Sequence, residues 1–288
     1  MVLDKALIIG YGKLGSHFNF ALKHSGKIEV SGIIRNEKSK QYPAIVKSSD
    51  IIFICVQDSK IKSAVKKLSS KGFDLKGKYI FHTSGSLTSD ELMPLVSKGA
   101  ITASFHPVQT FESIATKNRN RFKGIYIAVE GNPKALKKAG SVSKFIGSKT
   151  FIIRKENKIY HHICCVMASG FLAAIARGIE KLGSKKIRIN GFKNLSFFNI
   201  YMPLASQSLR NIASKGSVKS LSGPAERNDI STIEKHLLAL KNAPADILPV
   251  YMLMGIETVK LALEKKSIDR LQAEKILKVF DKQTKHLN

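Results

Sequence analysis

The first half of the chain alternates short apolar runs with segments of helical periodicity. The runs that we expect to form strands are Lys5–Ile9, Ile28–Ile34, Ile51–Val56, Tyr79–His82, Ile101–Phe105, Tyr126–Val129 and Thr150–Ile153. Several are almost continuously apolar, which is typical of strands covered by helices on both faces. Helical patterns lie between them, for example at Leu14–Lys23, Lys60–Leu68 and Pro133–Phe145. This alternation predicts an α/β domain with a doubly wound, mostly parallel sheet.

The pattern changes after Arg154, where helical periodicity takes over and no convincing strand follows. The expected helices are Lys158–Leu182, Leu195–Ser214, Ser231–Leu240, Pro244–Glu264 and Ile268–Lys282. We therefore expect an α/β domain over residues 1–154 and an all-helical domain over residues 155–288. A chain of 288 residues is long enough to bury a core in each.

A glycine-rich turn, Gly10-Tyr11-Gly12-Lys13-Leu14-Gly15, follows the first expected strand and opens the first expected helix. Gly10 permits the tight turn, Gly12 lets the backbone approach a pyrophosphate, and Gly15 permits close packing of helix on strand. The helix N-terminus then offers unpaired N–H groups to the phosphates. In this strand–turn–helix context the motif predicts a Rossmann-like dinucleotide-binding domain. The alternative is a glycine turn that binds no ligand.

The end of the second expected strand bears on the choice of cofactor. Sheets that bind NAD usually carry an acidic residue there for the ribose 2′-hydroxyl, whereas this chain has Arg35, followed by Lys38 and Lys40. A guanidinium suits a 2′-phosphate, so NADP is favoured over NAD. Val56, at the end of the third strand, is expected to lie against the cofactor. The alternative for Arg35 is a solvated cation on a basic protein.

The chain is strongly basic, with 48 Lys and Arg against 21 Asp and Glu and a net charge of +27. One interpretation is a nucleic-acid-binding surface. However, only nine of the basic residues are Arg and 39 are Lys, spread along the whole chain, whereas base recognition depends on clustered Arg. We interpret the excess as a solvated surface and expect no specific nucleic-acid partner. Attraction of anionic metabolites is the other interpretation left open.

Composition also bears on location and on cysteine chemistry. No run approaches the ~18 consecutive apolar residues of a membrane span, and the N-terminus lacks the pattern of a signal peptide. We therefore expect a cytoplasmic protein with no membrane partner. Cys55, Cys164 and Cys165 all lie in apolar runs, which predicts buried, reduced, structural thiols and no metal site.

The candidate catalytic residues are histidines close to where doubly wound sheets bind ligands, at the carboxyl ends of the strands. His106 is our first choice for a general acid, because an ordinary histidine pKa of about 6.5 suits proton exchange near neutral pH. His82 is a second candidate at the end of another strand. His162 begins the helical half, where it could face the cleft. The alternative for each is a structural histidine that packs or hydrogen-bonds between elements.

The candidate substrate-binding residues offer donors to an anionic group. Ser84 and Gly85 belong to a loop of small residues that could bind a carboxylate; the alternative is a tight turn that caps the next helix. Arg227 could bind a carboxylate or phosphate with both arms of its guanidinium. Asp229 could pair with Arg227 or cap the helix that starts near Ser231. His236 fits helix packing better than a site.

Three motifs resemble a known family: Phe81-His82-Thr83-Ser84-Gly85-Ser86-Leu87, Phe105-His106-Pro107-Val108-Gln109-Thr110-Phe111 and Ser222-Gly223-Pro224-Ala225-Glu226-Arg227-Asn228-Asp229. The family comprises bacterial oxidoreductases with a Rossmann-like N-terminal domain and a helical C-terminal domain of unknown function, similar to ketopantoate reductase and pyrroline-5-carboxylate reductase. The resemblance implies a C-terminal domain like that of 6-phosphogluconate dehydrogenase, dimerisation through it, and a nicotinamide cofactor. It implies no particular substrate.

The chain also departs from the pattern of that family. The family's helix reads His-x-Ala-Ala with an Asn seven residues after the His and a Phe next. Here His162 and Phe171 match, whereas Cys164 and Cys165 replace the alanines and Ser169 or Gly170 replaces the Asn. If that Asn contacts substrate in the family, this chain is altered in specificity or activity.

Together, these features predict an NADP-dependent oxidoreductase. It would transfer a hydride between the nicotinamide and a small carboxylated keto, hydroxy or imino metabolite, since such a reaction needs a bound nicotinamide, a proton donor and donors for the anionic end. The alternative is a non-catalytic NADP-binding sensor or regulator.

Overall fold

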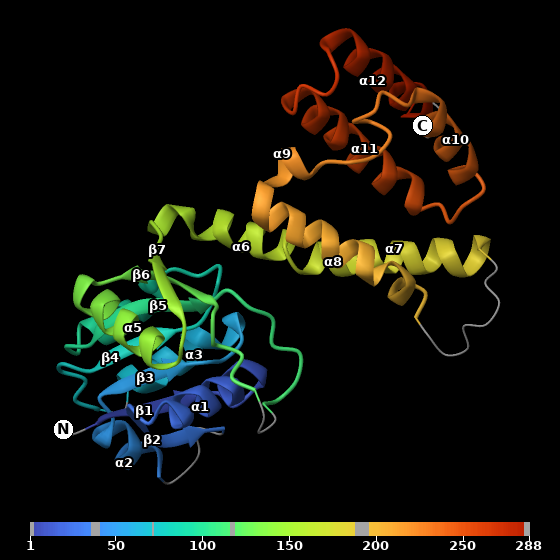
Figure 1. Cartoon of the computed structure of the whole chain (residues 1–288). Helices are drawn as coiled ribbons and strands as arrows, with labels where there is room; N and C mark the ends of the chain where they lie inside the picture. The colour runs from blue at the N-terminus through green and yellow to red at the C-terminus, as the bar shows by residue number, and fades with distance from the viewer. Residues whose placement is uncertain (1–2, 36–40, 71, 116–118, 188–195, 285–288) are drawn as a thin grey trace. The chain divides into compact units, whose positions relative to one another are not determined.

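The computed structural model describes residues 3–35, 41–70, 72–115, 119–187 and 196–284. It divides into two compact units, Met1–Ser169 and Gly170–Asn288, which we describe separately (Figure 1). The helix that follows Arg154, which we had placed with the helical domain, therefore packs with the α/β unit. Lys38 and Lys40 lie outside the described residues.

The first unit is built on a single described sheet in the order β2-β1-β3-β4-β5-β6-β7. Its strands are β1 (Asp4–Ile9), β2 (Ile28–Ile34), β3 (Ile51–Ile54), β4 (Tyr79–His82), β5 (Ile101–Pro107), β6 (Tyr126–Gly131) and β7 (Lys149–Ile152). All neighbouring pairs are parallel except β5 and β6. The predicted doubly wound, mostly parallel α/β sheet is confirmed, and β1 lies inside it, as the glycine turn requires.

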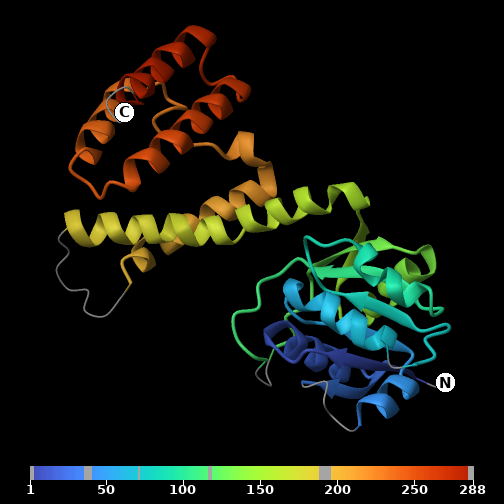
Figure 2. The ribbon, with the colours of Figure 1, turned by 180° about the vertical axis from the view of Figure 1, so that it is seen from behind.

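Helices cover both faces of this sheet, as the front and back views show (Figures 1 and 2). The helices of the unit are α1 (Lys13–Ser25), α2 (Tyr42–Ser48), α3 (Asp58–Ser70), α4 (Met93–Val96), α5 (Pro133–Phe145) and α6 (Lys158–Met167). Alternate residues of β1 pack on opposite faces of the sheet. Ile8 belongs to a core cluster with residues of α1 and α5, and Leu7 belongs to a second cluster with residues of α2 and α3. Continuous burial on both faces explains why the strands read as unbroken apolar runs.

The second unit consists of helices in its described part. They are α7 (Gly170–Lys186), α8 (Phe198–Lys215), α9 (Ser217–Ser220), α10 (Ile230–Leu240), α11 (Ile247–Glu264) and α12 (Arg270–Thr284). Its core brings Leu237 of α10, Met252 and Val259 of α11, and Ile276 and Phe280 of α12 together. These contacts confirm the helical character predicted for this half of the chain.

The predicted continuous helix Lys158–Leu182 is instead two helices, α6 and α7, with a turn at Ala168–Ser169. The hydroxyl of Ser169 donates to the carbonyl of Cys165 at 2.7 Å, and Gly170 follows it. A back-bonding serine next to a glycine is a common cause of a break in a helix. The apolar periodicity continues across the break, so periodicity alone could not reveal it.

One described segment, Lys155–Lys186, is long and apolar enough by composition to cross a membrane, contrary to our expectation of no such segment. It includes α6, the turn and α7, and its apolar window is exposed. Yet the ammonium group of Lys158, near its start, is buried against the α/β unit and bonds to Ser84 and Ser104. An exposed apolar helix face on a folded domain is also typical of a protein–protein interface.

Candidate functional site

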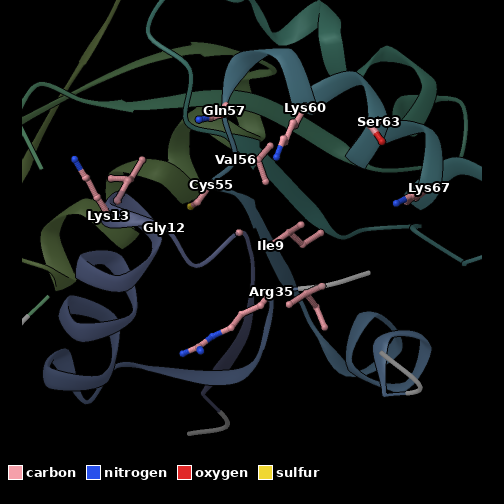
Figure 3. Close-up of a pocket in the computed structure, with 13 residues that line it drawn as sticks. Ile9, Gly12, Lys13, Arg35, Cys55, Val56, Gln57, Lys60, Ser63 and Lys67 are labelled. Carbon is pink, nitrogen blue, oxygen red and sulfur yellow. The ribbon is translucent and has the colours of Figure 1, made fainter. Parts of the chain in front are cut away.

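A cavity of about 930 Å³ lies beside the glycine turn, where β1, β2 and β3 end (Figure 3). Six of the predicted cofactor-binding residues line it: Gly10, Gly12, Lys13, Leu14, Arg35 and Val56. Tyr11 lines an adjoining hollow together with Gly12 and Arg35. The structure therefore brings the residues singled out for the dinucleotide to one place, at the carboxyl ends of the strands.

The glycines of the turn differ in what surrounds them. Gly10 has a φ of +97°, and a Cβ atom there would lie 2.5 Å from the carbonyl oxygen of Cys55. A Cβ atom on Gly15 would lie 2.1 Å from the carbonyl oxygen of Gly10, whereas one on Gly12 would meet nothing within 4 Å. Gly10 and Gly15 are thus required by the fold, while Gly12 leaves open space of the kind that a close-lying ligand needs.

The charged side chains that line the cavity are all positive. Of the 13 residues that line it, four are basic and none is acidic. Arg35 extends from the end of β2, with its guanidinium carbon 4.5 Å from the centroid of the Tyr11 ring. Lys60 and Lys67 of α3 line another side of the cavity (Figure 3). This arrangement suits a ligand with several phosphates.

Our sequence reading missed the contribution of α3. Lys60, Ser63 and Lys67 are spaced by three and four positions, which places them on one helix face. The buried Ile61, Ala64, Val65 and Leu68 occupy the adjoining face, which packs on the sheet. Because α3 follows the strand that supplies Val56, this polar face was the signal that could have identified a further wall of the cavity.

A second group of predicted residues meets at the ends of β4 and β5. A Cβ atom on Gly85 would lie 2.7 Å from Nε2 of His106 and 2.8 Å from Nδ1 of His162. These two nitrogens therefore both point into the space that a side chain at Gly85 would fill. Nδ1 of His162 is buried and has no hydrogen-bond partner among the described residues. The structure thus places Gly85, His106 and His162 together, although they lie far apart in sequence.

His106 differs from the general acid that we expected. Burial lowers its pKa to about 3, with the neighbouring His161 and Lys158 adding to the effect. Its Nδ1 lies 3.0 Å from Nε2 of His161. The ring is therefore neutral near pH 7, so it can polarise a group by hydrogen bonding but does not carry the extra proton of an imidazolium.

His82 has a structural position, which corrects its assignment as a catalytic candidate. The side chain is fully buried, and burial lowers its pKa to about 4. Its Nδ1 accepts the N–H of Ser84 at 3.2 Å, and Nε2 lies 2.9 Å from the carbonyl oxygen of Thr88. Both ring nitrogens are used within one loop, so His82 shapes the turn that carries Ser84 and Gly85.

The hydroxyl groups of that turn are also engaged. Ser84 and Ser86 each donate to Oδ2 of Asp58 at 2.8 Å. The Ser84 Oγ atom accepts the N–H groups of Ser86 and Leu87 at 3.2 and 3.0 Å. These contacts favour the alternative in which Ser84 forms a tight turn, and they leave no free hydroxyl on Ser84 for a substrate carboxylate. Asp58 is the first residue of α3, and its carboxylate connects the loops that follow β3 and β4.

Lys158 is a buried residue that the sequence analysis did not identify. Its side chain is 1 % exposed, and its ammonium donates to the Ser84 carbonyl at 3.1 Å and to Ser104 Oγ at 2.8 Å. Burial lowers its pKa to about 8, although Glu130 and Asp58 act in the opposite direction. Lys158 thereby joins α6 to the ends of β4 and β5. A lysine in a lysine-rich chain gives no signal of such burial.

Arg227 and Asp229 belong to the second unit. Asp229 is the N-cap of α10, since its carboxylate accepts the N–H of Thr232 at 3.0 Å and the hydroxyl of Thr232 at 2.7 Å. These bonds support the capping alternative, as the pattern before Ser231 suggested. Arg227 lies on the preceding loop with an exposed side chain. His236 contacts the hydroxyl of Tyr251 at 2.7 Å between α10 and α11, which agrees with helix packing.

Comparison with known protein families finds two domains in this chain, an N-terminal and a C-terminal one. Family models match a Rossmann-like domain over residues 5–107 and a domain of unknown function, DUF2520, over residues 125–258. A search of curated proteins finds no match. The resemblance inferred from the three motifs is thus confirmed at the level of domains.

Several solved structures have the same fold across nearly the whole chain. Protein TM1727 from Thermotoga maritima is 21% identical with a TM-score of 0.68, covering 91% of this chain and 99% of that one. BF3122 from Bacteroides fragilis, described as a candidate NADP oxidoreductase, is 20% identical with a TM-score of 0.66, covering 90% and 98%. Pyrroline carboxylate reductase from Plasmodium falciparum, solved with NADP bound, is 12% identical with a TM-score of 0.55, covering 96% and 98%. At these identities the likeness shows a shared fold.

Proposed function

Because the chain joins a Rossmann-like domain to a DUF2520 domain, we propose that it is an NADP-dependent oxidoreductase. In this proposal it transfers a hydride between the nicotinamide and a small carboxylated keto, hydroxy or imino metabolite. The observation that carries the proposal is the cavity beside Gly12, whose charged lining residues are all basic. The structural relatives include an NADP-bound pyrroline carboxylate reductase, which supports a nicotinamide cofactor.

The preference for NADP over NAD rests on Arg35. An acidic residue at this place would repel a 2′-phosphate, whereas a guanidinium binds it with charge-assisted hydrogen bonds. The ring of Tyr11 stacks against the guanidinium and limits its freedom. Lys60 and Lys67 add positive charge to the same cavity.

For the substrate, we propose that Gly85, His106 and His162 form the reacting end of the site. A neutral histidine can polarise a carbonyl or imine by donating a hydrogen bond as negative charge develops on the acceptor. The buried Nδ1 of His162, without a partner among the described residues, is available for such a contact. Arg227 of the second unit remains our candidate for binding an anionic group through its guanidinium. The net charge of +27 would favour the approach of anions.

A homodimer is part of the same proposal. Large apolar side chains are exposed along α7 and α8 of the helical unit, among them Phe171, Leu172, Met202, Leu204 and Leu209. Monomeric proteins rarely expose so many apolar side chains on adjoining helices. Sedimentation analysis should show a dimer that Leu204→Lys weakens and that Leu271→Lys, at another exposed leucine on α12, leaves intact. A monomeric wild-type protein would contradict the proposal.

The cytoplasm is the proposed location. No disulfide joins the three cysteines: Cys55 is buried, Cys164 exposed and Cys165 half-buried, all as free thiols. Free thiols persist in the reducing cytosol, although the exposure of Cys164 corrects our expectation that all three are buried.

The decisive experiment measures NADPH binding and turnover separately. Fluorescence titration should show binding of NADPH that is tighter than that of NADH. Addition of keto acids and cyclic imino acids should then decrease the near-ultraviolet absorbance of NADPH, while analogues without the carboxyl group react more slowly. Binding without turnover across the whole panel would favour the alternative of an NADP-binding sensor. Absence of NADPH binding would refute both functions.

A further inference from the structure

Three potential metal ligands meet between β5 and α6, away from the cavity beside the glycine turn. They are His106 at the end of β5 and His161 and Cys165 of α6, and one ligand atom of each lies within 4.8 Å of the other two. His161 and Cys165 are four positions apart, which puts them on one face of the helix. All three are half-buried, and all belong to the first unit.

The separations fit a single metal ion. Nδ1 of His106 lies 3.0 Å from Nε2 of His161, and Sγ of Cys165 lies 3.7 Å from the same nitrogen. With the bond lengths of tetrahedral zinc, neighbouring ligands are about 3.4 Å apart for two nitrogens and about 3.6 Å apart for nitrogen and sulfur. The ligand atoms of His106 and Cys165 lie within 4.8 Å of each other, so an ion requires this pair to come closer.

We propose that His106, His161 and Cys165 bind one zinc ion, with the fourth coordination position open. Two imidazoles and a thiolate form a donor set of borderline softness, which selects zinc over magnesium or calcium. A cavity of about 180 Å³ adjoins the ligands and is lined by residues 106–110 with Cys165, Ala168 and Ser169. It gives the open position room for a water molecule or a small oxygen ligand.

Zinc binds the neutral imidazole of histidine and the thiolate of cysteine. The Cys165 thiol would therefore release its proton to solvent when the metal binds.

The neighbouring charges are mixed. Lys158 is close enough to lower the pKa of both histidines and would oppose a cation, while Asp58 acts on His106 in the opposite sense. The thiolate supplies the negative charge that compensates part of the metal's charge. Binding would join α6 to the end of β5 and would place a Lewis acid next to His106, whose other nitrogen approaches Gly85.

The test uses the full chain, freed of metal by a chelator and kept reduced, and titrates it with Co²⁺ as a spectroscopic probe. We expect one Co²⁺ per chain, visible absorption bands of tetrahedral intensity, a near-ultraviolet thiolate-to-cobalt charge-transfer band, and displacement of Co²⁺ by Zn²⁺. Cys165→Ser should abolish the charge-transfer band. Cys164→Ser is the matched control, because it changes the adjacent exposed cysteine, and it should keep the band.

Two further measurements keep the result interpretable. His161→Ala, which retains both cysteines, should weaken Co²⁺ binding roughly 100-fold or more, since loss of even an outer partner of a metal ligand costs 10- to 100-fold. NADPH affinity and circular dichroism should remain as in the wild type for all variants, which separates loss of the metal site from loss of the fold. The proposal is overturned if the wild type shows no charge-transfer band, or if Cys164→Ser removes the band and Cys165→Ser retains it.

Discussion

The guanidinium of Arg35 lies over the ring of Tyr11, with 4.5 Å between the guanidinium carbon and the ring centroid. Tyr11 belongs to the glycine turn and Arg35 directly follows the neighbouring strand β2, so the contact joins the expected positions of the pyrophosphate and of the adenosine ribose. Cation–π stacking restricts the arginine and prepares it for an anion.

Arg35→Asp should therefore weaken NADPH much more than NADH. The change removes charge-assisted hydrogen bonds to the 2′-phosphate, each of which contributes about 1.5–3 kcal/mol, and it introduces repulsion. We expect at least a tenfold greater loss of NADPH affinity than of NADH affinity in fluorescence titrations. Arg270→Asp changes the net charge equally at an exposed residue of the second unit and should leave both affinities unchanged. Equal losses for the two cofactors in Arg35→Asp would contradict a 2′-phosphate role.

Gly12→Val and Gly15→Ala should fail in different ways. A Cβ atom on Gly12 meets nothing within 4 Å, whereas one on Gly15 would lie 2.1 Å from the carbonyl oxygen of Gly10. Gly12→Val should thus melt near the wild-type temperature but lose NADPH affinity by roughly 100-fold or more, because its side chain occupies the approach of the pyrophosphate. Gly15→Ala should lower the melting temperature. Normal NADPH binding by Gly12→Val would remove the turn from the cofactor site.

Most of the α/β architecture could be predicted from sequence because it depends on local signals. A strand or a helix is predicted from the residues that form it. The glycine turn and Arg35 likewise lie within a few residues of the strands after which the cofactor is expected to bind. The pairing of His106 with His161 spans 55 positions, and the bonds from Ser84 and Ser86 to Asp58 span 26 and 28. Such contacts depend on which strand ends become neighbours, and one sequence does not reveal them.

Two errors in our expectations have a common physical cause. His82 looked like a catalytic group, and Lys158 looked like one of many surface lysines. Both side chains are buried, and burial lowers the pKa of each. Burial of a polar side chain is decided by tertiary packing; the residue type alone favoured solvent for Lys158.

Gly85→Ala should separate the reacting end of the site from the cofactor end. The added methyl group would lie under 3 Å from ring nitrogens of His106 and His162, so both rings must move. We expect turnover of the best substrate in the panel to fall at least tenfold, with NADPH affinity within about twofold of wild type, since misplacement by about 1 Å can cost 100-fold in rate. Gly140→Ala, in helix α5 with only Thr150 near the added atom at 3.8 Å, should retain full turnover. Unchanged turnover in Gly85→Ala would place the reaction elsewhere.

Acid should destabilise the protein partly through His82. Its pKa is lowered to about 4 in the folded state from an ordinary value of 6.5. Between these values the unfolded chain binds more protons than the folded chain, so stability is full above pH 6.5 and is lost as the pH falls toward 4. Between pH 7 and pH 5 this one group should lower the free energy of unfolding by about 2 kcal/mol.

Urea denaturation of His82→Asn at these two pH values tests that mechanism. The variant should be less stable than the wild type at pH 7, because the bonds to Ser84 and Thr88 are changed, yet it should lose less stability on going to pH 5. His24→Asn is the matched control at an exposed histidine and should keep the wild-type acid sensitivity. If His82→Asn loses as much stability as the wild type between pH 7 and pH 5, the acid sensitivity arises from other groups, with His106 the first to examine, because its pKa is lowered to about 3.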